Sequence, residues 1–295
     1  MTKQTLMFVN PVSLSLRYNQ LVIHLKGSEE EVTRPIEDIA VVVIENQAVQ
    51  VTVPLLNALA TQNVSVVICD DKAMPNAMLM PLETNNTQQE TYRIQCEASQ
   101  PTRKRIWRDL IEGKIRNQAA MLYRAGRQGD LLRPYYSNVL SGDSDNREGA
   151  AARIYWRELF GPTFVRSREG NQPNAMLNYG YALLRAATAR ALMGSGLLPA
   201  FGIFHRNRYN AFPLADDVME PYRPFVDAIV YDLHARQGKT SLDKDAKSRL
   251  LRILFADVDI DGTTHPLEVA LTLTTASLVR ALKDNNQHIR CPSFP

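Results

Sequence analysis

The side chains best suited to chemistry gather in residues 204–224, a polar stretch that contains one histidine, three carboxylates and three arginines. Strongly apolar segments flank this stretch, so helices on both sides can hold it rigidly, as a metal site requires. His205 would supply a nitrogen ligand and Glu220 an oxygen ligand. A third ligand must come from elsewhere in the chain, and Glu148 is our candidate.

One histidine and two or three carboxylates suit a hard divalent ion, so we expect Mg²⁺ or Mn²⁺. Zinc is disfavoured because the chain has no thiolate pair, no HExxH helix and no histidine triad. The chain also lacks GxxxxGK[ST], GxGxxG and GxSxG, which removes support for ATP-driven, NAD-dependent and serine-hydrolase chemistry. Arg206, Arg208 and Arg223 beside the carboxylates could hold a phosphodiester.

Both glutamates also have a structural interpretation. Asp145 to Glu148 and Asp217 to Glu220 each fit the spacing of a capping box, in which the glutamate reaches back to the N-cap amide. A single histidine is more often a hydrogen-bonded structural residue than a ligand. The sequence physics alone leaves capping and metal binding open, and Asp216 or Asp217 could add to the metal site.

The sequence patterns of the strands and helices that must position these residues predict an α+β fold. Residues 1–83 read as a β-rich N-terminal domain, because residues 12–16 and 21–26 alternate and residues 39–44 form a β-branched apolar run. One helix, at 54–60, interrupts this pattern. A polar shift at residues 83–90 predicts a linker over 84–99. Residues 100–295 read as a larger all-α catalytic domain.

Within that second domain the apolar spacing predicts helices at five main places: 107–122, from 144–146 to 159, 174–193, 225–233 and 266–283. The apolar helix at 174–193 should lie at the domain centre. There Asn178 and Tyr179 read as core polar groups that satisfy neighbouring loops, with DNA contact as the alternative. Residues 257–262 predict a tight turn or a small hairpin.

Composition excludes several classes of protein. An apolar fraction of 45% in 295 residues argues against general disorder, and a net charge of +3 argues against a polycation. Three widely spaced cysteines fit a reducing compartment. No signal peptide and no membrane span is predicted, so we expect a cytoplasmic protein.

Basic residues concentrate between Arg103 and Arg133. This stretch holds nine basic and three acidic residues, a local net charge of +6, which is twice that of the whole chain. A basic helix face is a plausible phosphate-binding surface, and a solvated face with ordinary ion pairs is the alternative.

Four stretches resemble the CRISPR-associated integrase family (Cas-one, the adaptation-module endonuclease), and the last two are most similar to its type II branch. They are Glu148–Trp156, Asn174–Leu184, His205–Asn207 and Asp217–Pro224. The resemblance covers nearly the whole chain. It implies that the metal ligands are Glu148, His205 and Glu220, because the family uses a glutamate, a histidine and an acidic residue.

The resemblance also implies a reaction and its partners. The 3′-hydroxyl of a short DNA fragment attacks a phosphodiester at a CRISPR repeat end, which inserts a new spacer without ATP. Implied partners are double-stranded DNA, a second copy of the chain, the small adaptation protein (Cas-two) and the large type II effector nuclease. The N-terminal domain would provide dimerisation and partner contacts.

Two other functions stay open. A non-catalytic DNA-binding scaffold would use its acidic residues only to cap helices. A metal hydrolase of small phosphates would not need an extended basic surface, so the basic helix argues against it.

Overall fold

The structure is a computed structural model. It describes residues 4–25, 27, 30–81, 83, 85–167, 173–205 and 207–295. The chain divides into two compact units, Met1–Glu83 and Thr84–Pro295. Each unit is described by itself below.

The first unit contains two four-stranded sheets. One has the order β1-β5-β7-β8, with β8 antiparallel to β7 and the other pairs parallel. The other has the order β4-β3-β2-β6, in which β2, β3 and β4 form an antiparallel meander. The bounds are β1 (Gln4–Phe8), β2 (Val12–Arg17), β3 (Gln20–Leu25), β4 (Glu31–Pro35), β5 (Ile39–Ile44), β6 (Gln50–Val51), β7 (Ser65–Cys69) and β8 (Pro75–Leu79).

A single apolar core joins both sheets to helix α1 (Val53–Thr61). Leu14 and Leu21 come from one sheet, Val42 comes from the other, and Leu55 and Leu59 come from α1. All six residues of β5 are buried, as its continuous apolar run predicted. The β-rich character of this part of the chain is therefore confirmed.

The second unit is mostly helical. Its helices are α2 (Gln88–Glu97), α3 (Gln100–Arg124), α4 (Arg133–Tyr136), α5 (Arg147–Phe160), α6 (Asn174–Gly194), α7 (Pro213–Val218), α8 (Arg223–Tyr231), α9 (Lys244–Leu251) and α10 (Leu267–Lys283). In the part of the chain that the structure describes, no helix is both long and apolar enough to cross a membrane.

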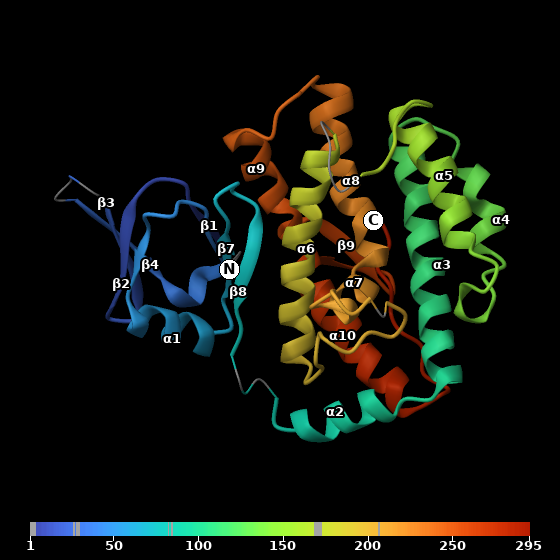
Figure 1. The fold of residues 1–295 in the computed structure, drawn as a ribbon, viewed down its shortest axis with the longest axis horizontal. Helices are drawn as coiled ribbons and strands as arrows, with labels where there is room; N and C mark the ends of the chain where they lie inside the picture. Colours follow the sequence, from blue (N-terminus) through green and yellow to red (C-terminus); the bar gives the residue numbers. More distant parts are fainter. Residues whose placement is uncertain are drawn as a thin grey trace. The chain divides into compact units, whose positions relative to one another are not determined.

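Helix α3 organises this unit. It starts where the Ser99 hydroxyl accepts a hydrogen bond from the Thr102 amide, and it ends before Gly126, which has a φ of 71°. Its buried residues extend through most of its length. Helix α5 packs on one side of α3, and α8 lies between α3 and α6 (Figure 1). Helices α5 and α8 therefore both pack against α3.

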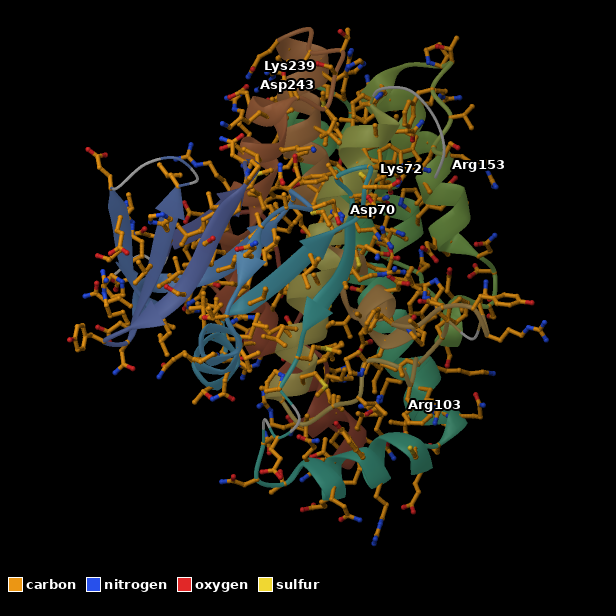
Figure 2. The ribbon with its side chains drawn as sticks, turned by 60° about the vertical axis from the view of Figure 1, so that its left-hand side comes forward. Asp70, Lys72, Arg103, Arg153, Lys239 and Asp243 are labelled. Carbon is orange, nitrogen blue, oxygen red and sulfur yellow. The ribbon has the colours of Figure 1, made fainter. Side chains whose placement is uncertain are left out.

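Two details refine the expected organisation. Residues 84–99 are not an open linker, because residues 88–97 form α2, and Arg103 donates hydrogen bonds to the carbonyls of Gln95, Cys96 and Ala98 at its end (Figure 2). The polar composition misled because α2 exposes most of its surface. The helical unit also contains one hairpin, β9 (Asp257–Ile260) and β10 (Thr263–Pro266), where a turn or hairpin was expected.

The C-terminal segment packs against α3. The Asn117 side chain donates hydrogen bonds of 2.8 Å to the carbonyls of both Pro221 and Pro292. A Cβ atom on Gly113 would lie only 2.8 Å from that of Cys291, so glycine is required for this close approach. Asn117 thus ties the segment after Glu220 to the end of the chain.

Candidate metal and phosphodiester site

Glu148 lies in the first turn of α5, but other residues cap that helix. The Asn146 side chain accepts a hydrogen bond from the Gly149 amide, and the Asp143 carboxylate accepts from the amides of Arg147 and Glu148. Asn146 itself has a φ of 54°, which asparagine tolerates better than most residues. The capping interpretation of Glu148 is therefore wrong, and its carboxylate is left for other contacts.

Glu220 follows α7 and begins a single 3₁₀ turn, Glu220–Tyr222. It is only 4% exposed and lies between two cations. Its Oε1 is 2.9 Å from Arg223 Nε, and its Oε2 is 2.6 Å from Lys114 Nζ. Burial alone would raise the pKa of Glu220, but the charges of Arg223 and Lys114 outweigh burial and lower that pKa to about 2. Glu220 is therefore a buried anion and not a helix cap.

Lys114 joins the two glutamates. Its Nζ atom lies 2.6 Å from Glu148 Oε1 as well as 2.6 Å from Glu220 Oε2. Burial would lower the pKa of Lys114, yet the two carboxylates more than compensate and raise it. The structure thus brings Glu148 and Glu220, 72 positions apart in the sequence, to one shared cation.

Glu220 Oε2 is buried, and the Lys114 ammonium lies 2.6 Å from it in a charge-assisted hydrogen bond that also lowers the pKa of Glu220. Carboxylate oxygens that already hold one cation are also the oxygen ligands that a hard divalent ion prefers. Glu148 and Glu220 therefore have the chemistry that a hard divalent ion needs.

His205 lies in the loop before α7, where Asp217 orients it. His205 Nδ1 is 2.5 Å from Asp217 Oδ1, and Asp217 also accepts hydrogen bonds from the amides of Ile203, Phe204 and His205. The hydrogen bond with Asp217 raises the pKa of His205. Pairing of Nδ1 with a carboxylate leaves Nε2 as the nitrogen that can bind a ligand.

Asp216 and Asp217, considered as further ligands, have other partners. Asp217 is fully buried behind His205. Asp216 forms a two-pronged ion pair with Arg185 and accepts a 2.7 Å hydrogen bond from Asn210. Among the residues that the structure describes, no three histidine, cysteine or acidic side chains converge closely enough to hold a metal ion. The two glutamates meet at Lys114, whereas His205 influences Glu220 electrostatically.

A pocket of about 260 Å³ opens beside Glu220, lined in part by Lys114, Glu220, Arg223, Arg166 and Trp156. Its cationic lining suits a phosphate group. Arg206, expected to contribute here, lies outside the described residues.

The floor of this pocket contains Asp227, which accepts hydrogen bonds from Tyr155 at 2.7 Å and from Tyr181 at 2.5 Å. Burial raises the pKa of Asp227 to about 6 despite these hydrogen bonds. Arg166 also donates a 2.7 Å hydrogen bond to Asn178, as expected of a polar group that satisfies a neighbouring loop.

Sequence reasoning missed Lys114, Arg166 and Asp227 as site residues. Lys114 was counted only as part of the basic stretch. A signal was present, because Lys114 follows Trp107 and Ile111 at helical spacing and therefore shares their buried face.

The basic stretch is largely committed to protein contacts. Arg103 caps α2, and Arg105 donates to the carbonyls of Ala281, Asn285 and Gln287 at the end of α10. Arg108 and Arg116 pair with neighbouring acidic residues. The alternative of ordinary intramolecular pairing therefore accounts for much of this helix. Exposed cations occur elsewhere, for example Arg153 on the outer face of α5 (Figure 2).

A second pocket, of about 510 Å³, borders the His205 loop. Arg103, Arg208 and Asn207 line it together with His205. His205 thus lies between a cation-lined pocket and its own buried aspartate.

Comparison with known proteins gives one consistent family. The family model described as CRISPR associated protein Cas1 matches residues 6–253. A CRISPR-associated endonuclease Cas1 from Neisseria meningitidis is 38% identical over 290 residues, which cover 97% of this chain and 94% of that protein.

Two solved structures share the fold. A casposase bound to integration product has a TM-score of 0.76 at 22% identity and covers 96% of this chain and 90% of its own. A chain of a Cas6-RT-Cas1–Cas2 complex has a TM-score of 0.69 at 18% identity and covers 97% of this chain and 35% of its own.

Proposed function

Because this chain belongs to the CRISPR-associated Cas1 family, we propose that it is a metal-dependent DNA integrase and endonuclease that inserts new spacers into a CRISPR array. One observation carries the proposal: Glu148 and Glu220, from separate elements, meet at one buried cation with His205 nearby. A related endonuclease at 38% identity supports the reaction class.

Glu148, Glu220 and His205 would hold Mg²⁺ or Mn²⁺ through two carboxylate oxygens and one imidazole nitrogen. When bound, such an ion lowers the pKa of an attacking hydroxyl and stabilises negative charge on the reacting phosphate. Asp217 would keep the proton on His205 Nδ1 and leave Nε2 as the nitrogen that could bind the ion.

Arg223 and Arg166 would bind the phosphate that is attacked. Both guanidinium groups line the pocket beside Glu220, and both lie over the Tyr181 ring, at 4.6 Å and 5.2 Å from its centroid. Their charges would offset those of the phosphate oxygens. No protein nucleophile is needed, because the 3′-hydroxyl of the incoming DNA attacks and the 3′-oxygen of the cut strand leaves.

The partners follow from the family. We propose double-stranded DNA as spacer precursor and repeat, a homodimer, and a complex with Cas2, in agreement with the descriptions of the casposase and of the Cas1–Cas2 assembly. The large effector nuclease is a further proposed partner. Residues 1–83 would carry the dimer and Cas2 contacts, residues 84–99 would connect the two units, and residues 100–295 would carry the chemistry.

The test is joining of a labelled duplex to a supercoiled CRISPR plasmid by Glu148→Gln, Glu220→Gln and His205→Ala, with and without Cas2. We expect each to fold and bind DNA but to lose joining by more than the roughly 10–100-fold that follows loss of a ligand's outer partner. Glu112→Gln, a partly exposed glutamate paired with Arg116 on α3, is the matched control.

The competing function is a non-catalytic DNA-binding scaffold. A scaffold would bind DNA equally in EDTA and in Mn²⁺, and none of the variants would differ from the wild type in joining. Wild-type joining by a normally folded Glu148→Gln protein would refute the catalytic assignment.

A further inference from the structure

A lysine occupies the place between the two proposed metal-binding carboxylates. Lys114 Nζ lies 2.6 Å from an oxygen of Glu148 and 2.6 Å from an oxygen of Glu220. The lysine is 9% exposed and comes from the middle of the longest helix of the unit, so its backbone is firmly anchored.

Charge at this place is already balanced. Glu148 and Glu220 contribute two negative charges, and Lys114 and Arg223 contribute two positive charges. Two carboxylates brought together in a buried site without a cation would repel each other strongly. Lys114 therefore neutralises the two carboxylates in the metal-free protein, as a bound metal ion would.

A divalent ion and the ammonium cannot share the same oxygens. Mg²⁺ requires ligand distances of about 2.0–2.1 Å, so an ion on both carboxylates would lie against the ammonium at its present position. Lys114 also lines the 260 Å³ pocket, which gives its flexible stem a place to move.

We infer that Lys114 is a built-in counter-cation, a positioning residue that holds Glu148 and Glu220 together in the metal-free protein and competes with the metal for them. The inference rests on the proposed metal site. It predicts that the protein is stable without metal at the expense of metal affinity.

The experiment compares the full-length wild type with Lys114→Met, which keeps an unbranched apolar stem but removes the charge. Thermal melting is measured in EDTA and in saturating Mn²⁺, and Mn²⁺ binding is measured by calorimetry. We expect Lys114→Met to melt lower than wild type in EDTA and to bind Mn²⁺ about tenfold more tightly, equivalent to about 1.4 kcal/mol. Saturating Mn²⁺ should restore most of its stability.

Lys247→Met is the matched control. Lys247 is a comparably buried lysine in α9, and its Nζ lies 5.7 Å from the centroid of the Tyr179 ring. Its replacement should lower stability equally in EDTA and in Mn²⁺ and leave the Mn²⁺ dissociation constant unchanged.

Lys114→Arg keeps the experiment decisive if Lys114→Met does not fold in EDTA. The guanidinium can pair with both carboxylates, so this variant should melt like wild type without metal and should bind Mn²⁺ no more tightly. Equal dissociation constants for wild type and Lys114→Met, or tighter binding by Lys114→Arg, would overturn the inference.

The outcome is separable from that of the proposed function. Absence of Mn²⁺ binding in every variant would refute the metal site itself. Binding of equal strength in every variant would refute only the role of Lys114.

Discussion

Replacement of Asp217 by asparagine tests how the site orients His205. In the wild type one carboxylate oxygen accepts from the amides of Ile203 and Phe204, and the other faces His205 Nδ1 and the His205 amide. Asparagine has only one oxygen. If that oxygen keeps the amides of Ile203 and Phe204, its NH₂ group faces two donors on His205. The imidazole must then accept at Nδ1, which moves its proton to Nε2, the nitrogen proposed to bind the metal.

The size of the effect follows from these contacts. Loss of a carboxylate that holds a metal-binding histidine typically weakens metal affinity about 10–100-fold, or about 1.4–2.8 kcal/mol. Hydrogen bonds to a charged acceptor contribute about 1.5–3 kcal/mol each. One such bond is lost outright in Asp217→Asn. We therefore expect a loss of about 2 kcal/mol in stability, or about 4–8 °C in melting temperature for a unit of this size.

The assay measures the Mn²⁺ dissociation constant by calorimetry and the rate of strand joining, beside a melting curve. Asp216→Asn is the control, because Asp216 pairs with Arg185 and not with His205. It should keep wild-type metal affinity. Two results would refute the reasoning: unchanged metal affinity in Asp217→Asn, or a total loss as deep as that of Glu220→Gln, which would make Asp217 a ligand itself.

Three further predictions concern stability. Arg105→Glu should lower the free energy of unfolding in urea by about 2–4 kcal/mol, because Arg105 donates to three carbonyls at the end of α10. The control Arg127→Glu, at an exposed position, should change stability by less than about 0.5 kcal/mol. Equal urea midpoints for the two variants would contradict this prediction. Burial raises the pKa of Asp227 to about 6. Protonated Asp227 therefore adds to the free energy of unfolding in full below the usual aspartate pKa, and this contribution is lost as pH rises through 6. The Asp227→Asn variant cannot lose this contribution, so its stability relative to wild type should rise by up to about 3 kcal/mol between pH 4 and pH 8. A difference in melting temperature between the two proteins that stays constant over this pH range would contradict the prediction. Asn117→Ala should lower stability by about 1–3 kcal/mol for each of the two carbonyls left without a donor. It should also speed proteolysis of the C-terminal segment, and an unchanged cleavage rate would show that the Asn117 hydrogen bonds do not hold this segment.

The architecture was largely predictable because it follows local periodicity. Alternating and β-branched runs predicted the strands of the first unit, and apolar residues three and four apart predicted the helices of the second. Those signals come from residues that are close together in the sequence. The polar composition of residues 84–99 could not reveal that residues 88–97 form a helix, because polar composition does not separate an exposed helix from an open loop.

The site was only partly predictable, for a related reason. Glu148 and Glu220 could be chosen by residue type, but their meeting at Lys114 depends on packing among α3, α5 and the turn after α7. An aspartate three residues before a glutamate fits a capping box and a buried site equally well. Only the positions of Asp143 and Asn146 show that the cap of α5 is already provided.

The tie made by Asn117 has a consequence for biosynthesis. The ribosome makes α3, the Glu220 turn and Pro292 in that order, so the Asn117 side chain cannot hold both carbonyls until Pro292 has left the exit tunnel. The turn that carries Glu220 can pair with Lys114, Arg223 and Asn117 as soon as it is made, and its link to the C-terminal segment is added only at the end of synthesis.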